Sequence, residues 1–118
     1  MQVALMLSRR GLGQVWPNPA VGCVIIKDDR VVGRGWTQPF GRPHAEVHAL
    51  TQAGPASRGA TAYVTLEPCA HHGKSGPCAN ALVDAGIARV VSAITDPDPR
   101  VSGKGYSILR SSGVTVSE

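Results

Sequence analysis

Residues 60–69 read ATAYVTLEPC, and the prediction of the fold starts from this segment. Its first seven residues, which end with Leu66, are small, β-branched, aromatic or aliphatic, as in a buried strand, and the segment from Glu67 to Pro77 reads as a loop. A helix is expected next over residues 78–85, followed by another strand over 88–95. This order of strand, helix and strand predicts a right-handed crossover between parallel strands.

The rest of the chain extends this pattern on both sides. Helices are expected over residues 2–10, from about His44 to Ala53 and near Lys104–Ser111, with strands over 20–26, 31–36 and 114–116. The order αββαβαβαβ predicts an α/β fold with an opening hairpin, a largely parallel sheet and helices on both faces. Ligands bind beyond the C-terminal ends of the strands in such sheets. The loops Glu67–Cys78 and Asp96–Pro99 are therefore expected to share one rim.

Two helices show which of their faces should be buried. Val3, Met6 and Leu7 are expected on one face of the first helix. In the second helix, Val47 and Leu50 are expected to face the core. Both predictions rest on the spacing of the larger apolar residues.

Length and composition place the chain among globular proteins. It has 118 residues, of which 42% are hydrophobic and 17% charged, and residues 1–118 are expected to form one domain. No apolar run is long enough to span a membrane, and the first arginines follow the apolar start, so a cytoplasmic protein is expected. The net charge of +4 suits a phosphorylated substrate or nucleic acid, or is plain surface charge.

The three cysteines argue against a disulfide framework. Cys23 lies in the apolar run VGCVII and is expected to be a buried core residue. Cys69 and Cys78 lie among prolines, glycines and histidines, as metal ligands do. Cys78 is also expected to open a helix, where the helix dipole favours a thiolate.

His44, Cys69 and Cys78 offer one imidazole and two thiolates, which are good zinc ligands. Zinc takes four ligands, so three from the protein leave one position for water, as in catalytic sites. Glu46, two residues after the histidine, is free to move protons for that water. The layout H-x-E followed by P-C-x-x-C is typical of zinc nucleobase deaminases, and here eight residues separate the two cysteines.

Other roles for the nearby histidines stay open. His71 or His72 could supply a fourth ligand and close the site, although Glu46 would then have no function. His48 lies one turn after the histidine ligand and is expected to pack or face solvent rather than bind metal. Tight C-x2–4-C pairs are usual in structural sites, so the wider spacing favours an open, catalytic site.

Six segments of the chain match one known family. They are NPAVGCVI (18–25), PHAEVHAL (43–50), GATAYVTLEPC (59–69), GPCA (76–79), DP (96–97) and VSGKG (101–105). Together they closely resemble the pyrimidine deaminases of riboflavin biosynthesis, the diaminohydroxyphosphoribosylaminopyrimidine deaminases, almost from end to end. The wide cysteine spacing is specific, because cytidine and tRNA-adenosine deaminases use a short C-x2-C.

The resemblance implies a cytidine-deaminase-like three-layer α/β/α sandwich with a mixed five-stranded sheet and an opening antiparallel hairpin. It implies hydrolytic removal of the ring amine from a phosphoribosylated diaminopyrimidinone, with release of ammonia. Carried over by position, His44, Cys69 and Cys78 bind zinc and Glu46 is the proton shuttle. The residues that it implies contact the base, ribose or phosphate are Asn18, His71, Lys74, Asp96 and Asp98.

Several features depart from the family pattern. Asp98 stands where asparagine is common and would repel a phosphate, so a hydroxyl or the base is its better partner. Ala70 replaces a usual serine. Lys74 lies in a glycine-rich stretch that lacks the full phosphate-loop pattern, so it either contacts a substrate anion or is a solvated charge. Bacterial members often carry an NADPH-dependent reductase domain, which would begin near Glu118. No glycine-rich dinucleotide signature appears in this sequence, so no reductase activity is expected here.

Two other functions remain in competition. A deaminase acting on RNA would share the metal chemistry and suit the positive charge, but one Phe, two Trp and two Tyr offer few surfaces for stacking bases. A non-catalytic zinc-binding domain would leave Glu46 without a role. Partners beyond the substrate stay open: a homo-oligomer, and a reductase that acts next in the pathway, are both compatible with the sequence.

Overall fold

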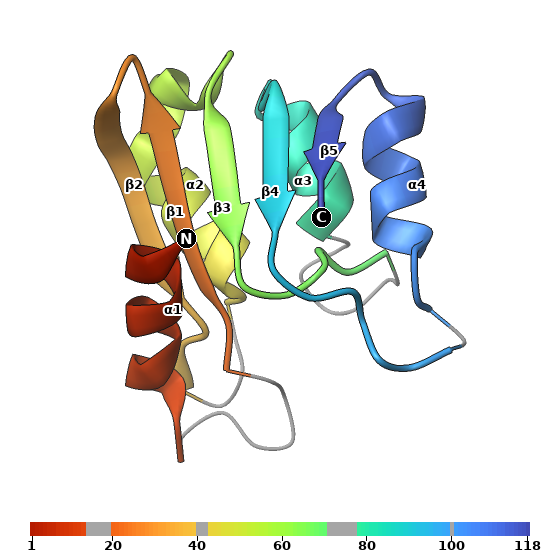
Figure 1. Ribbon diagram of the computed structural model, residues 1–118. Coiled ribbons are helices and arrows are strands. Elements are labelled where there is room, and N and C mark those ends of the chain that lie inside the picture. Colours follow the sequence, from red (N-terminus) through yellow and green to blue (C-terminus); the bar gives the residue numbers. More distant parts are fainter. Residues whose placement is uncertain (14–19, 40–42, 71–77, 100) are drawn as a thin grey trace.

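The computed structural model describes residues 1–13, 20–39, 43–70, 78–99 and 101–118. Its centre is a five-stranded sheet in the order β2-β1-β3-β4-β5 (Figure 1). The strands are β1 (Gly22–Lys27), β2 (Arg30–Trp36), β3 (Thr61–Val64), β4 (Arg89–Ser92) and β5 (Thr115–Ser117). The helices are α1 (Gln2–Ser8), α2 (Ala45–Ala53), α3 (Cys78–Asp84) and α4 (Lys104–Ser111), with 3-10 turns η1 (Arg9–Gly11) and η3 (Gly54–Ser57).

The sheet is mixed, as expected, and opens with an antiparallel hairpin. β1 pairs antiparallel with both β2 and β3, whereas β3, β4 and β5 run parallel to one another. β2, β3, β4 and β5 therefore run in one direction, as a largely parallel sheet requires, and β1 alone runs against them. α2 joins β2 to β3 by passing behind the sheet in Figure 1, which leaves β1 between two strands that oppose its direction.

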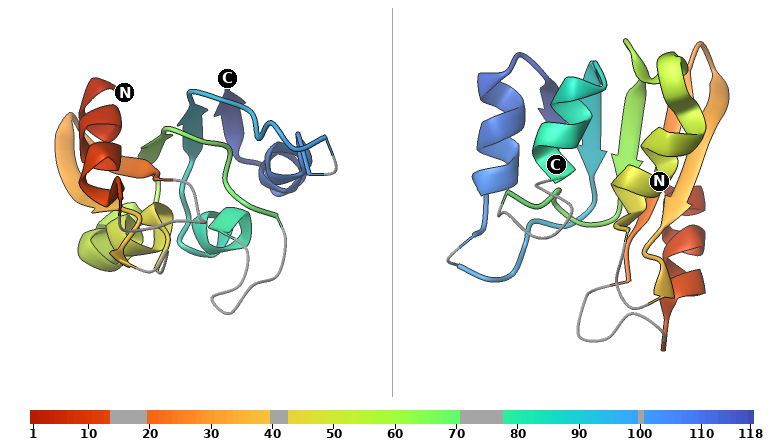
Figure 2. Two further views of the ribbon diagram at one scale, coloured as in Figure 1. Left: turned by 90° about the horizontal axis from the view of Figure 1, so that it is seen from below. Right: turned by 180° about the vertical axis from the view of Figure 1, so that it is seen from behind.

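Helices cover both faces of this sheet and give the expected three layers. Figure 2 shows α1 on one face and both α2 and α3 on the opposite face. Leu109 of α4 packs into the same core as Leu82 of α3 and the alanines of α2. A smaller cluster joins Ala4 and Leu7 of α1 to Val24. None of the helices in the described ranges is long and apolar enough to cross a membrane.

The contact between α2 and β2 is unusually close. A Cβ atom at Gly35 would collide with the carbonyl oxygen of Ala45, and one at Gly33 with that of Ala49. Small side chains on both elements therefore let the helix backbone approach the strand. The buried face of α2 consists of Ala45, Glu46, Ala49 and Ala53, whereas Val47 is only half-buried. The prediction that Val47 and Leu50 define the inner face is wrong for Val47, while Leu50 packs at the edge of the core.

In α1, too, a small residue faces a glycine of the sheet where the helix backbone comes close. Ala4 and Leu7 are buried, but Val3 and Met6 are 47% and 66% exposed, so the expected buried face is wrong for these two residues. A Cβ atom at Gly22 would collide with the carbonyl oxygen of Ala4. The small residue therefore faces the sheet at the closest approach, and the larger side chains turn away from it.

The parallel strands β3 and β4 end at the same edge of the sheet, at the bottom of Figure 1. The chain that leaves β3 carries Glu67 and Cys69, and the chain that leaves β4 carries Ile94 and Asp96. The backbone N–H of Glu67 donates to the carbonyl oxygen of Ile94 over 2.8 Å. The expectation that these two segments share one rim is therefore confirmed.

Candidate metal centre

Three elements bring one imidazole and two thiols together at this rim. His44 is the N-cap of α2, in extended backbone with φ −67° and ψ 161°, and Cys78 is the first residue of α3. Cys69 lies on the segment that follows β3. Their ligand atoms all lie within 4.8 Å of one another. The Nδ1 atom of His44 is 3.2 Å from Cys78 Sγ and 3.8 Å from Cys69 Sγ.

The backbone fixes the two sulfur atoms relative to each other. The N–H of Cys78 donates to Cys69 Sγ over 3.2 Å, and the N–H of Ala79 donates to the Cys69 carbonyl oxygen over 3.1 Å. The free N–H groups at the start of α3 therefore point at Cys69. The sequence suggested that this helix start would favour a thiolate at Cys78. In the structure, the start of α3 favours a thiolate at Cys69 instead.

The two thiols share one negative charge in the absence of a cation. A hydrogen bond from the Cys78 side chain is the largest cause that lowers the pKa of Cys69, to about 4, and His44 lowers it further. The same hydrogen bond, together with burial, raises the pKa of Cys78 well above its usual value. A second thiolate beside the first needs a positive charge to stabilise it. One imidazole nitrogen and two sulfurs are the donor set that suits zinc, so the residues present fit this metal.

Glu46 lies in the first turn of α2, immediately beside these ligands. It is only 4% exposed, although no basic residue in the described part of the chain forms an ion pair with it. Burial raises the pKa of its carboxyl to about 7, and the Cys69 thiolate adds to this, while its own backbone N–H, His44 and Cys78 oppose the shift. A carboxyl with a pKa near neutrality can both accept and return a proton at the pH of the cell.

Cys23 and His48 take the structural roles that the sequence suggested. Cys23 is fully buried in the core, and burial, followed by the nearby Glu46 charge, raises the pKa of its thiol. The backbone N–H of Trp36 donates to His48 Nδ1 over 3.3 Å, and Gln38 Nε2 lies 3.0 Å from the same ring nitrogen. Its ring meets the Trp36 ring edge-on, with centroids 4.8 Å apart. His48 therefore holds the end of β2 against α2 and is not part of the ligand group.

The substrate contacts implied by the family resemblance are only partly visible. Asn18, His71 and Lys74 lie outside the described residues, as does His72, the other candidate for a fourth ligand. Asp96 and Asp98 are half-buried on the segment that follows β4. The N–H of Asp98 donates to Asp96 Oδ1 over 2.9 Å, which makes a compact turn.

Sequence reasoning missed one buried acidic residue at this rim. Glu67, two residues before Cys69, is 5% exposed, and its carboxylate accepts backbone N–H groups from Asp96 and from the start of α4. The signal in the sequence was an acidic residue directly after a buried strand, at the edge where the ligands lie. Its partners are backbone groups, which leave no trace in the sequence.

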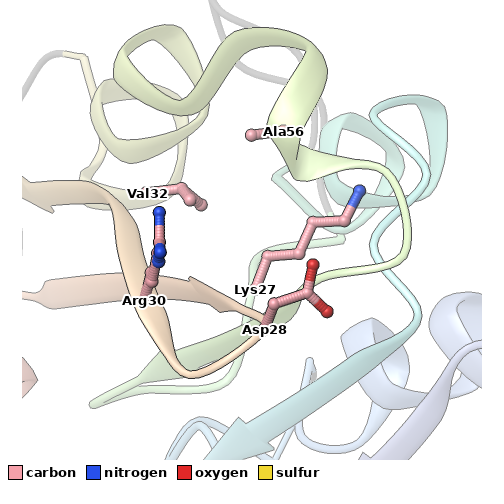
Figure 3. Close-up of a pocket in the computed structure, with 5 residues that line it drawn as sticks. All are labelled: Lys27, Asp28, Arg30, Val32 and Ala56. Carbon is pink, nitrogen blue, oxygen red and sulfur yellow. The ribbon is translucent and has the colours of Figure 1, made fainter.

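A shallow pocket elsewhere on the molecule does not belong to this centre. Figure 3 shows it beside the β1–β2 hairpin, lined by Lys27, Asp28, Arg30, Val32 and Ala56. Lys27 follows Ile26, which pairs with Thr61 at the start of β3. The candidate metal ligands lie beyond the other end of β3, so the whole length of the sheet separates the pocket from them.

Known proteins share both the sequence and the fold of this chain. Residues 1–94 match the family model described as the cytidine and deoxycytidylate deaminase zinc-binding region. The chain is 56% identical over 117 residues to the riboflavin biosynthesis protein RibD of Escherichia coli, covering 99% of this chain and 32% of that protein. It is 47% identical over 116 residues to a diaminohydroxyphosphoribosylamino-pyrimidine deaminase of Buchnera aphidicola, covering 98% of this chain and 79% of that protein.

One solved structure has the same fold as this chain. It is that of a diaminohydroxyphosphoribosylaminopyrimidine deaminase/5-amino-6-(5-phosphoribosylamino)uracil reductase from Thermotoga maritima. The TM-score is 0.92 at 46% identity, and the match covers 100% of this chain and 34% of that one. The chain thus spans about a third of the length of the RibD protein and of this bifunctional enzyme, but most of the length of the Buchnera deaminase.

Proposed function

Because the chain belongs to the diaminohydroxyphosphoribosylaminopyrimidine deaminases, within the zinc-binding cytidine and deoxycytidylate deaminase family, we propose that it is a zinc-dependent hydrolase of riboflavin biosynthesis. Its reaction removes the ring amine of the phosphoribosylated diaminopyrimidinone and releases ammonia, leaving the corresponding uracil. The observation that carries this proposal is the buried Glu46, with its pKa near 7, beside a group of one histidine and two cysteines.

The chain's own residues supply the metal site. His44, Cys69 and Cys78 would hold the zinc from the N-cap of α2, the segment after β3 and the first residue of α3, and backbone hydrogen bonds support these positions. When bound, zinc supplies the acidity that makes water a nucleophile near neutral pH. Two anionic sulfur ligands offset the charge of the metal, so a nearby base is needed to complete the removal of the proton.

Glu46 is that base. Its carboxylate takes a proton from the attacking water and passes it to the ring nitrogen next to the reacting carbon. The new hydroxyl on the reacting carbon then gives its proton to the same carboxyl, which delivers it to the amine as the carbon–nitrogen bond breaks. Ammonia leaves and the hydroxyl oxygen becomes the carbonyl oxygen of the uracil. Burial keeps the pKa of Glu46 near 7, so this carboxyl can both accept and release a proton near neutral pH.

The substrate's ribose and phosphate would meet the neighbouring loops. A lysine is a mobile point charge suited to phosphate, which gives Lys74 this role. Asp96 and Asp98 cannot favour a phosphate directly, so the sugar hydroxyls are their partners. Asp96 Oδ1 accepts one N–H from Asp98, and a carboxylate has about four acceptor sites, so capacity for a hydroxyl remains. Asn18 and His71 would complete the contacts to the base.

The deaminated product has a consumer of known chemistry. The Thermotoga relative combines, in its name, a deaminase with a reductase that acts on 5-amino-6-(5-phosphoribosylamino)uracil. We therefore propose that the product of this chain is handed to a reductase of that class. The reductase is either joined to the deaminase or a separate protein.

Ammonia release from three substrates tests the proposal. The zinc-loaded chain is assayed with the diaminopyrimidinone ribose phosphate, with cytidine and with a tRNA stem-loop that contains the editable adenosine. We expect rapid turnover of the first substrate and little or none of the others. Turnover of the stem-loop alone would replace the proposal with an RNA deaminase. No turnover of any of them by a zinc-loaded chain would point to a non-catalytic zinc-binding domain.

A further inference from the structure

Glu67 is a buried carboxylate with four backbone partners. Its Oε1 atom accepts the N–H groups of Asp96 and Gly103, each over 3.0 Å. Its Oε2 atom accepts the N–H of Gly105 over 2.9 Å and that of Tyr106 over 3.4 Å. A carboxylate offers about four acceptor sites, so these four bonds use them all. In the described part of the chain Glu67 forms no ion pair, and its charge is stabilised by N–H groups alone.

Three of these partners lie at the start of α4. Gly103 is the N-cap of this helix, and having no side chain it cannot cap the helix itself. The N–H groups of the first turn have no partner inside a helix, and they carry the positive end of its dipole. Glu67, 36 residues earlier in the chain, supplies the missing cap. Gly105 is required here because a Cβ atom would collide with the carbonyl oxygen of Pro68.

The fourth partner lies on the loop that carries Asp96 and Asp98. The backbone N–H of Glu67 donates to the carbonyl oxygen of Ile94, and the Glu67 side chain accepts the backbone N–H of Asp96. Glu67 therefore holds this loop at two points that lie two residues apart. The side chain of Asp96 then fixes Asp98. Tyr106 adds a second tether, because its hydroxyl donates to Ser92 Oγ over 2.8 Å and approaches the Ile94 carbonyl at 3.3 Å.

We infer that Glu67 is a positioning residue for substrate binding, which holds the Asp96–Asp98 loop in a fixed place relative to Cys69 and hence to the reacting centre. It takes no part in proton transfer, because all its acceptor sites are engaged by backbone groups. This inference rests on the proposed function, since it takes Asp96 and Asp98 as contacts of the substrate's ribose. In this inference the Glu67 side chain connects the segment that carries Cys69 to the loop that carries Asp96 and Asp98.

Glu67→Gln is the test variant, because it keeps the shape and replaces one acceptor oxygen with an amide that cannot accept. In either orientation two N–H groups lose their acceptor. We expect the KM for the diaminopyrimidinone phosphate to rise by about tenfold or more, since two hydrogen bonds to a charged group are lost. The kcat should stay within about threefold of the unmodified chain. Zinc content and the absorption spectrum of the cobalt-substituted protein should not change.

A double-mutant cycle shows whether Glu67 acts through the Asp96 loop. Asp96→Ala is made alone and together with Glu67→Gln. We expect the second substitution to raise KM by much less once Asp96 lacks its carboxylate, so the two effects are not additive. Additive effects would overturn the inference. A fall in kcat alone, or loss of zinc, would overturn it as well, because Glu67 would then serve the metal or the chemistry.

Two further variants cover the remaining outcomes. If Glu67→Gln does not fold, Tyr106→Phe loosens the same loop from the α4 side and should raise KM with kcat unchanged; no change in KM would contradict the inference. Asp28→Asn is the matched control, because it removes the charge of an exposed carboxylate beside the hairpin pocket, at the other end of the sheet, and it should change neither parameter. An unmodified chain inactive on the substrate overturns the proposed function and this inference together. An active chain whose Glu67→Gln variant has normal KM overturns this inference alone.

Discussion

The backbone N–H of Cys78 donates to the Sγ atom of Cys69 over 3.2 Å, so the start of one ligand's helix stabilises the thiolate of the other ligand. The hydrogen bond from the Cys78 side chain is the largest cause that lowers the pKa of Cys69, this backbone bond adds to it, and the pKa of Cys78 is raised in turn. The centre is therefore partly prepared for a cation, because one sulfur is already ionised and the imidazole nitrogen lies 3.2 Å from the other. Binding of a metal still has to displace one proton.

Zinc binding should release about one proton at pH 7. The pKa of the Cys78 thiol is raised in the metal-free protein, and a bound metal ion needs its thiolate, so zinc competes with a proton there. Zinc affinity should therefore rise with pH and fall as the medium becomes acidic. Isothermal titration calorimetry in two buffers with different ionisation enthalpies measures the number released. Cys78→Ala should bind zinc more weakly and release correspondingly fewer protons, and equal release by both proteins would show that the proton comes from another group.

Gly35→Ala should destabilise the fold and weaken zinc binding together. The new Cβ atom would meet the carbonyl oxygen of Ala45, so α2 has to move away from β2. Overpacking of this kind costs about 1–3 kcal/mol of unfolding free energy. Because α2 carries Glu46 and begins after His44, its displacement should also loosen the ligand group. Chemical denaturation and zinc affinity are measured, with the exposed neighbour Arg34→Ala as the control. A variant as stable as the control would mean that the approach is less close than the structure has it.

Lys74→Ala should weaken the phosphorylated substrate far more than its dephosphorylated analogue. The reason is that a lysine charge contributes to phosphate binding and has no partner once the phosphate is removed. The ratio of kcat/KM for the two substrates reports this directly. Lys27→Ala is the matched control, because Lys27 lies at the far end of the sheet beside the hairpin pocket. An equal loss on both substrates would make Lys74 a plain structural or surface charge.

Much of the fold could be predicted, because its signals are local. The start of α3 at Cys78 and the bounds of α4 were correct, since glycine and proline mark the helix ends and apolar residues recur with helical spacing. The candidate ligands could also be predicted from the sequence. Histidine and cysteine side chains narrow the choice of metal, and the spacing of the two cysteines narrows the choice of family. These predictions needed no knowledge of distant contacts.

The wrong predictions of the buried faces of α1 and α2 have a common physical cause in glycine. Gly22 and Gly35 on the strands allow helix backbones to come close, so alanines rather than larger residues face the sheet. Periodicity of large apolar residues cannot reveal such a contact, because the information lies on another element. The direction of β1 between β2 and β3 was hidden for a similar reason: strand order is a property of the whole chain. Glu67 was missed because its partners are backbone N–H groups, which every residue except proline carries.

The turnover of zinc-loaded Glu46→Gln tests the central claim most directly, that a buried carboxyl beside His44, Cys69 and Cys78 moves the protons of a hydrolytic deamination. The substitution keeps the shape of the side chain and removes its ability to take a proton. We predict that ammonia release from the diaminopyrimidinone phosphate falls by about a hundredfold to ten-thousandfold, while the zinc content stays at that of the unmodified chain. Ammonia release within about threefold of the unmodified chain would contradict the account, because the proton would then travel by another group.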